Sequence, residues 1–342
     1  MSDQESSIIK GWPASLENLN GFSKIQFPEI TEYLSYSRIK EMNRSMAHFK
    51  YRYIDGNKPE PTKDMEFGKL LHSALLEPKK FKSQMVFAPR KEDYTGLIDT
   101  ADDIKAELKK MHIRASGTKD KLEKILVNIS PSYQDRLWSH IKKSYQDKVE
   151  KLRLQTVTRK QGDQILGMIE SINRHKMANK LTSKGESELA AYWQDPDLGV
   201  TWLVKLDYLQ IGRGPDGKPV AWITELKTTK DASPWGFPKE MDNFSYNLQN
   251  WIYTRVVHGI TGIKTNLVQL AVEKAAPYGV ATYCPDERVT ESSEGQVRKL
   301  IKQYRQCEAE DHWPMYEEKI IPIGLPNYAY WRTEEQADRD KF

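Results

Sequence analysis

Residues 201–229 form the stretch on which the predicted fold depends, TWLVKLDYLQIGRGPDGKPVAWITELKTT. Two runs rich in Val, Ile, Trp, Thr and Tyr flank residues 212–218, whose Gly and Pro content is typical of a turn. The sequence therefore predicts a β-hairpin. Asp216 lies midway between Asp207 and Glu225. If the hairpin is symmetric about Asp216, the two carboxylates face each other on adjacent strands, with about 5 Å between their Cβ atoms.

The acidic and basic side chains of this hairpin suggest a metal-dependent phosphodiesterase. Glu225 and Lys227 are two positions apart and therefore share one face of the sheet. Mg²⁺ takes oxygen ligands and uses only one or two carboxylates, which Asp207 and Glu225 supply. We expect Lys227 to hold the attacking water or the developing negative charge, and the backbone carbonyl of Leu226 to offer one more ligand. The alternative is a surface hairpin with an ordinary cross-strand Glu–Lys pair.

The composition of the whole chain excludes several classes of protein. Its 342 residues contain no run of apolar residues long enough for a transmembrane helix. The segment Met1–Glu5 is acidic and is no secretory signal. Only Cys284 and Cys307 are present, so neither a disulfide framework nor a thiolate zinc site is expected. A cytoplasmic protein fits these features. The net charge of +4 permits nucleic-acid binding without indicating it.

Hydrophobic periodicity and breaker residues predict the remaining elements. We expect irregular structure over residues 1–30 and a mostly helical, charged region from Ala101 to Lys180. The expected helices are Ser35–Tyr53, Met65–Glu77 (ended by Pro78), Phe244–His258 (ended by Gly259) and Ser293–Glu308, and the expected strands lie within Glu188–Ile211, Val220–Thr228 and Leu267–Glu273. This order of elements indicates an α/β or α+β fold.

Three further positions are candidates for a site. His72 lies in an otherwise apolar helix, either as a packed histidine or as a metal ligand. Gln249 and Tyr253 are four residues apart and share a helix face, as a packed polar pair or as a binding element.

These residues, in this order, resemble the RecB-type branch of the PD-(D/E)xK nuclease superfamily, and within it the RecE-like exonucleases (exonuclease VIII and phage relatives). The family pattern is a Gly-x₃-His helix, a Glu-headed strand, an Asp, a Glu-x-Lys and a Gln-x₃-Tyr. The matching segments here are Gly68–His72, Glu188–Trp193, Asp207, Glu225–Lys227, Gln249–Tyr253 and, as a late strand, Val272–Tyr278. Two features depart from the pattern. Leu206 precedes the Asp where many relatives have Pro or Arg nearby, and Glu186 competes with Glu188 for the head of the strand.

The resemblance implies a restriction-endonuclease-like core, with a central mixed sheet flanked by helices. It implies one or two Mg²⁺ or Mn²⁺ ions at His72, Asp207, Glu225 and the Leu226 carbonyl. It also places Glu188, Gln249 and Tyr253 in the catalytic site. The implied activity is processive 5′→3′ digestion of double-stranded DNA ends, which leaves 3′ single-stranded tails. The implied partners are other copies in a ring and a RecT-like single-strand annealing protein of phage or prophage recombination.

Two alternatives to this function remain open. One is an endonuclease or a CRISPR-adaptation nuclease on the same fold. The other is a catalytically idle DNA-binding protein, although the intact Asp207, Glu225 and Lys227 argue against it.

An apparent insertion separates the His72 helix from the Glu188 strand. Its segment Ala101–Leu122 resembles a SAP motif, a small helical DNA-binding module, and divides the chain into residues 1–99, the insertion 100–132 and a catalytic core 133–342. Its basic residues are expected to contact phosphates without reading bases. They are Lys105, Lys109, Lys110, Arg114, Lys119, Lys121 and Lys124. The alternative is a charged helical hairpin with a solvated face.

Overall fold

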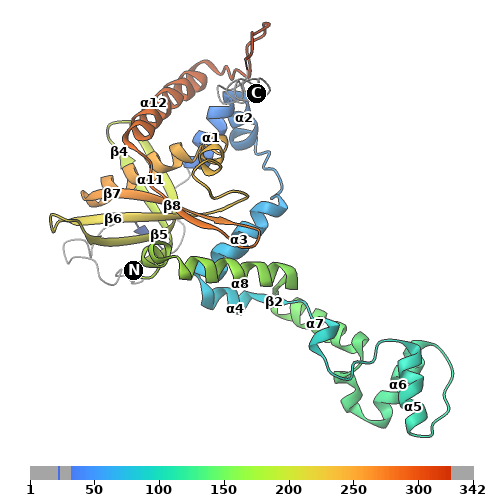
Figure 1. Ribbon diagram of the computed structural model, residues 1–342. Coiled ribbons are helices and arrows are strands. Elements are labelled where there is room, and N and C mark those ends of the chain that lie inside the picture. The colour runs from blue at the N-terminus through green and yellow to red at the C-terminus, as the bar shows by residue number, and fades with distance from the viewer. Residues whose placement is uncertain (1–21, 24–31, 325–342) are drawn as a thin grey trace, which may run out of the picture.

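The computed structural model describes residues 22–23 and 32–324. The described part of the chain forms a body around a six-stranded sheet, from which a helical arm projects (Figure 1). Helices cover the sheet on both faces, as the sequence predicts for a mixed α/β protein. The irregular structure expected over residues 1–30 lies outside the described residues, except that Phe22–Ser23 form a short strand.

The sheet has the strand order β1-β4-β5-β6-β7-β8. Its strands are β1 (Phe22–Ser23), β4 (Glu186–Asp195), β5 (Val200–Arg213), β6 (Pro219–Thr229), β7 (Lys264–Glu273) and β8 (Val280–Tyr283). All neighbours are antiparallel except β6 and β7, which run parallel. A parallel pair needs a crossover connection, and α10 (Phe237–Asn243) and α11 (Tyr246–Thr261) provide it.

The β5–β6 hairpin has the register that the sequence predicts. Its backbone pairs run from Arg213 with Pro219 to Tyr208 with Thr224, and each pair is symmetric about Asp216. The pairing ends there, one position before Asp207 and Glu225, while β6 continues to pair with β7 as far as Thr229. The two strands therefore part at the two carboxylates.

Two apolar layers hold helices against the two faces of the sheet. On one face, Trp202 and Ile223 pack in a core shared with α1 (Tyr36–Arg44), α2 (Met46–Phe49), α11 and α12 (Glu287–Glu310). On the other, Leu226 and Leu270 pack with α3 (Lys63–Leu76), α8 (Arg159–Arg174) and α9 (Lys176–Thr182). The point where β5 and β6 part thus lies between α3 and α11.

The arm leaves the body after α3 and returns before α8 (Figure 1). Its base is α4 (Pro78–Gln84) and a parallel pair of short strands, β2 (Met85–Phe87) and β3 (Gln155–Val157). Beyond them lie α5 (Ala101–Lys110), α6 (Lys119–Ile129) and α7 (Trp138–Leu152). A 3₁₀ turn at Lys91–Asp93 precedes α5, and another at Pro131–Asp135 joins α6 to α7. The tip has an apolar core of its own, formed by Ile98, Ile104, Leu108, Leu122, Leu126 and Leu137. No helix in the described ranges is long and apolar enough to span a membrane.

The observed helix boundaries confirm some expectations and correct one. The first expected helix is interrupted at Ser45, whose side chain caps α2, and its last turn, Lys50–Ile54, is π-helical. Pro78 ends the His72 helix and begins α4. The prediction that Gly259 ends the later helix is wrong, because α11 continues to Thr261 and ends at Gly262, which has a φ of 68°.

Gly259 has a packing role instead of a terminating one. A Cβ atom at this position would lie 2.3 Å from the Trp193 ring of β4, so glycine is what lets α11 approach the sheet closely.

We predict that Gly259→Ala destabilises the protein by about 1–3 kcal/mol, because the added methyl group overpacks the interface with Trp193. The matched control is Gly295→Ala in α12, where a Cβ atom meets nothing within 4 Å. That change should stabilise the protein by up to about 1 kcal/mol, since alanine is the better helix former. Chemical denaturation of both variants measures the difference, and an equal response to both would contradict the packing role.

Candidate active site

Where β5 and β6 separate, hydrogen bonds from side chains replace the backbone hydrogen bonds between the two strands. The amide of Asp207 donates to Oε1 of Glu225 at 3.2 Å, and the amide of Leu226 donates to Oδ2 of Asp207 at 2.8 Å. Each carboxylate thus satisfies a backbone N–H that the other strand no longer reaches. Asp207 and Glu225 are fixed in place by the same strand separation that leaves room between them.

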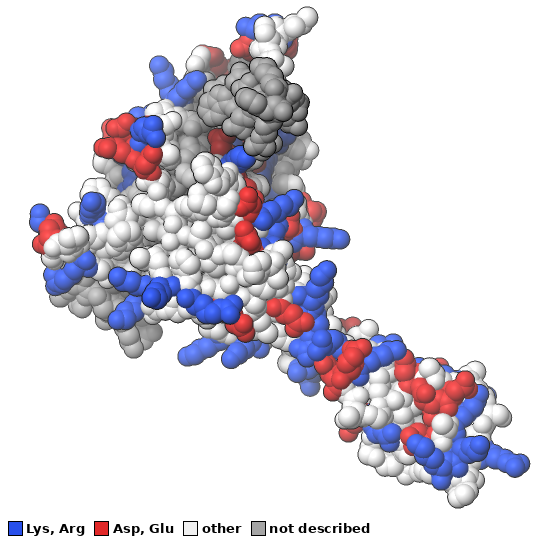
Figure 2. Space-filling model, viewed as in Figure 1, with Lys and Arg blue, Asp and Glu red and all other residues white. Residues whose placement is uncertain are grey.

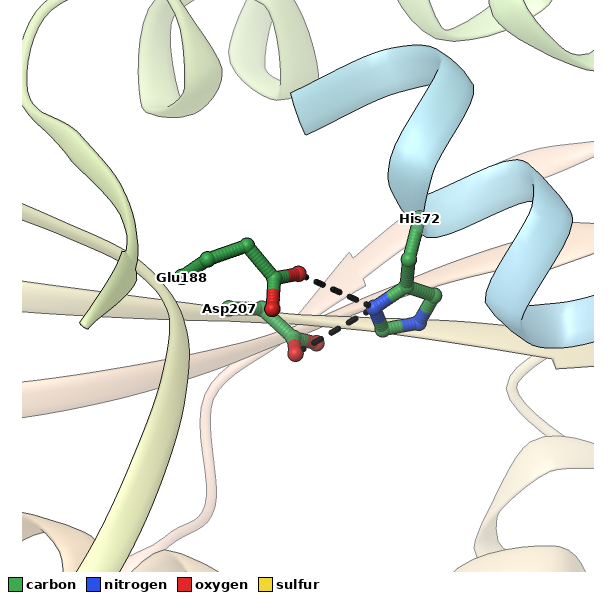
Figure 3. Close-up of side chains that lie close together, drawn as sticks. All are labelled: His72, Glu188 and Asp207. Carbon is green, nitrogen blue, oxygen red and sulfur yellow. Dashed lines mark ion pairs between the residues drawn. The ribbon is translucent and has the colours of Figure 1, made fainter. Parts of the chain in front are cut away.

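His72 approaches this point from α3. Its Nδ1 lies 3.2 Å from Oδ1 of Asp207 and 3.9 Å from Oε1 of Glu188 (Figure 3). Its Nε2 lies 3.1 Å from the carbonyl oxygen of Leu226, which can only accept, so Nε2 carries a proton and donates. In the neutral ring Nδ1 is then the nitrogen with a free lone pair, and it faces the two carboxylates.

Glu188 reaches the same group from β4. Its neighbours Ser187 and Leu189 pair with Tyr208 and Leu206, which places Glu188 opposite Asp207. Glu188 itself has a φ of 54°, a left-handed conformation that costs a non-glycine residue free energy and is common at functional sites. Between the two acids left open by the sequence, the structure therefore brings Glu188, and not Glu186, to His72 and Asp207. Lys205 forms an ion pair with Glu188.

The three side chains suit a divalent cation. One ligand atom from each of His72, Glu188 and Asp207 lies within 4.8 Å of the other two. Ligands on adjacent octahedral positions at about 2.1 Å from a small cation are about 3 Å apart, close to the spacing of His72 and Asp207. An imidazole with two carboxylates is also a donor set that Mn²⁺ and Mg²⁺ accept. The donors present therefore fit the metal expected from the sequence.

Glu225 lies beside this group, engaged with other partners. Its Oε2 accepts from Nζ of Lys227 at 3.1 Å and from Nε2 of Gln249 at 2.8 Å. The carboxylate is almost wholly buried, and burial together with the charge of Asp207 raises the pKa of Glu225 to about 7, although Lys227 opposes the shift. Glu225 can therefore gain or lose a proton near neutral pH.

The pKa values of the neighbouring ionisable groups are shifted by burial and by the charges of one another. Burial lowers the pKa of His72, but the charge and hydrogen bond of Asp207 outweigh it and the net shift is upward. Burial raises the pKa of Asp207, yet His72 and Lys227 hold it below its usual value. Burial lowers the pKa of Lys227, and Glu225 and Asp207 more than compensate, so Lys227 remains a cation. Opposite charges therefore favour the ionised forms of these buried groups.

Sequence reasoning missed three residues around Lys227. The Lys227 ammonium lies 4.8 Å from the ring centroid of Tyr246 on α11. Tyr36 of α1 donates to the carbonyl of Phe244 at 2.5 Å, and Lys40 lies 5.0 Å from the centre of the Phe244 ring. Tyr246 precedes Gln249 by three residues, so helical spacing was a signal for it. Nothing local marks Tyr36 or Lys40, because α1 reaches the site only through tertiary packing.

Tyr253 lies in the core of the body, whereas the predicted DNA-binding residues lie on the arm. Tyr253 lies one turn beyond Gln249 and is buried in the core, where burial and the charge of Glu225 raise its pKa. The basic residues of the insertion lie on the arm (Figure 1). Lys105, Lys110 and Lys119 are engaged there with acidic residues. The arm lysines are therefore no part of the carboxylate site.

We predict that Mn²⁺ affinity falls as the pH drops below about 7. Below its pKa of about 7, Glu225 holds a proton, and the raised pKa of His72 favours a second bound proton. A cation that is bound by or next to these groups must displace those protons, so affinity rises with pH until both are deprotonated. Calorimetry at pH 6 in two buffers of different ionisation enthalpy measures the protons released per ion.

The variant Glu225→Gln cannot hold the carboxyl proton and should release fewer protons per Mn²⁺. Glu186→Gln on the same strand as Glu188 is the matched control and should behave as the wild type. Equal proton release by the wild type and Glu225→Gln would contradict the assignment.

The chain was compared with protein families, curated proteins and solved structures. Residues 35–322 match the family described as "PDDEXK-like domain of unknown function (DUF3799)". No curated protein matches the sequence. Among solved structures, one described as "Putative exonuclease" from Eubacterium rectale has 12% identity and a TM-score of 0.49, covering 86% of this chain and 91% of that one. Another, SSO0001, has 14% identity and a TM-score of 0.24, covering 71% and 86%.

The family match spans both the His72 helix and every strand that carries a site residue. The chain therefore belongs to the PDDEXK-like family DUF3799.

Proposed function

We propose that this protein is a metal-dependent deoxyribonuclease whose active site lies where β5 and β6 part. The observation that carries the proposal is the convergence of His72, Glu188 and Asp207 beside a buried Glu225–Lys227 pair. Membership of a PDDEXK-like family supports a nuclease independently of that geometry.

Each residue has a distinct role in this proposal. A bound divalent ion supplies a Lewis acid and lowers the pKa of its water. His72, Asp207 and Glu188 would hold the ion, with Glu225 and the Leu226 carbonyl next to it. Lys227, kept cationic by the acids around it, would orient the attacking water or neutralise charge that develops on the phosphate. Gln249 fixes the orientation of the Glu225 carboxylate through its hydrogen bond.

The finer activity that we propose is processive 5′→3′ digestion of double-stranded DNA ends. The order of motifs from His72 to Tyr253, with its resemblance to RecE-like exonucleases, supports this choice over an endonuclease. The same resemblance supports Mg²⁺ or Mn²⁺ as the ion, a ring of identical subunits, a RecT-like annealing partner and action in the cytoplasm.

We predict that Asp207→Ala, Glu225→Gln and Lys227→Met each lower the rate of DNA hydrolysis by at least about a hundred-fold, the usual effect of removing one preorganised charge from a transition state. Each variant should remain folded by circular dichroism. Glu294→Gln is the control, because that carboxylate pairs with Arg298 at 2.8 Å on α12. A rate near that of the wild type in any of the three variants would remove its residue from the active site.

The choice of substrate separates the alternatives. Linear duplex labelled at the 5′ or the 3′ end reports polarity, and covalently closed circular DNA reports endonuclease activity. Cutting of the circular substrate would overturn the exonuclease proposal while leaving a nuclease in place. No metal-dependent cutting of any DNA would overturn the nuclease itself.

We also propose that the arm is an auxiliary DNA grip. Its tip folds around an apolar core separate from the body, and its lysines and arginines are interspersed with acids on the face in Figure 2. Among the described residues, Lys109, Arg114 and Lys121 are exposed and form no ion pair, unlike Lys105 and Lys110. The unpaired cations are the ones available to phosphates, which supports the SAP-like role expected from the sequence.

We predict that replacing Lys109, Arg114 and Lys121 with Ala weakens duplex binding and reduces its dependence on salt, because fewer counterions are released from the DNA. The control replaces Lys105 and Lys110, whose charges are already compensated, and should have a smaller effect. The cleavage rate at saturating DNA should not change in either variant. Fluorescence anisotropy over a range of salt concentrations measures binding, and an unaltered salt slope in the triple variant would contradict the DNA grip.

A further inference from the structure

Trp235 is an exposed aromatic residue that the site described above does not use. Its exposed fraction of 83% exceeds the 66% of Tyr316 and the 61% of Tyr51, the next most exposed large aromatics in the described part of the chain. It lies in the loop between β6 and α10, which begins three residues after Lys227. The loop follows the strand that carries Glu225 and Lys227, so the exposed indole ring belongs to a segment that is directly connected to the candidate active site.

The loop presents Trp235 in a fixed position. The amide of Ser233 donates to Oδ1 of Asp231 at 2.8 Å, and the amide of Gly236 donates to Oγ of Ser233 at 3.1 Å. The loop is also tied to the sheet, because the amide of Ala232 donates to Glu273 at 3.0 Å and its carbonyl accepts from Tyr283 at 2.5 Å. Trp235 therefore projects from a hydrogen-bonded turn, which lowers the entropy lost on binding.

A chain of aromatic rings connects this loop to the site. Phe237, two residues after Trp235, is buried and stacks on Tyr283 with centroids 5.1 Å apart and on Tyr246 at 6.4 Å. Tyr246 in turn lies under the Lys227 ammonium at 4.8 Å. Phe244, at the other end of α10, is 44% exposed and stacks on Tyr246 at 5.6 Å. Trp235 and Phe244 are thus exposed rings on either side of α10. The first residue of that helix, Phe237, packs against Tyr246, whose ring contacts the Lys227 ammonium.

We propose that Trp235 is a stacking platform for a nucleobase of the DNA strand engaged in the active site, with Phe244 as a second contact. This inference rests on the proposed nuclease function and adds to it a specific contact to the substrate. Bases stack on exposed indole rings whatever their sequence, as a nuclease without sequence preference requires. Lys230, the first residue of the loop, is exposed, and Lys40 lies over the Phe244 ring, so each ring has a cation nearby that could contact a flanking phosphate.

The experiment measures binding and cleavage of linear duplex DNA by the full chain, with binding measured in Ca²⁺ and cleavage in Mn²⁺. The variants are Trp235→Ala and Trp235→Phe, with Tyr51→Ala as the control at an exposed aromatic residue of a different element. Each variant is compared on two duplexes, one with normal ends and one whose terminal nucleotides are abasic and therefore offer no ring to stack.

We expect Trp235→Ala to weaken binding of the normal duplex about ten-fold, within the range for loss of one base stack, and Trp235→Phe to restore most of it. On the abasic duplex, the wild type and Trp235→Ala should bind alike, since the base that Trp235 would contact is missing. Tyr51→Ala should match the wild type on both. Thermal unfolding should be unchanged in all variants, because the replaced side chains are exposed.

The outcomes separate this inference from the proposed function. If the wild type cuts DNA and Trp235→Ala binds both duplexes as the wild type does, the nuclease stands and the platform is overturned. If Trp235→Ala loses binding equally on both duplexes, Trp235 contacts something other than a base, and the platform is again overturned. If the wild type neither binds nor cuts DNA, both proposals fall.

Discussion

The separation of β5 from β6 after the Tyr208–Thr224 pair is the constraint on which the site depends. A strand that loses its neighbour leaves backbone N–H groups without acceptors, and a buried N–H must find one. Asp207 and Glu225 supply those acceptors for each other's strands. These hydrogen bonds also fix the orientation of the two carboxylates. The separation of the strands therefore both requires the carboxylates and positions them in the site.

Burial explains why the site holds so many compensating charges. Glu225 and Lys227 are both nearly inaccessible to water, and a lone charge in either position would be strongly unfavourable. Gln249 donates a hydrogen bond to Glu225, and the Tyr246 ring contacts the Lys227 ammonium. A divalent cation adds positive charge to a group of three carboxylates, which favours its binding and the loss of protons from Glu225 and His72 together.

In the functions proposed above, the arm and the loop that bears Trp235 each add a contact to the substrate. The arm carries cations on a separate apolar core, so changes at its tip leave the packing of the sheet unaffected. The loop that bears Trp235 is hydrogen-bonded to the sheet itself, through Glu273 and Tyr283. The two proposed contacts differ in kind, because the arm would bind phosphates along the DNA while Trp235 would stack on a base.

The sequence by itself determined the hairpin and its register about Asp216, because alternation and turn residues act over short distances. That the strands separate at Asp207 and Glu225, and that each carboxylate accepts from the other strand's backbone, appears only in the tertiary structure. The sequence also marked His72, Gln249 and the helical insertion, through local spacing and resemblance. Only the tertiary structure decided between Glu186 and Glu188, since a left-handed backbone conformation at Glu188 leaves no signal in composition. It likewise gave Gly259 its packing role against Trp193 and brought Tyr36 and Lys40 of α1 into contact with Phe244, because those contacts join segments far apart in the chain.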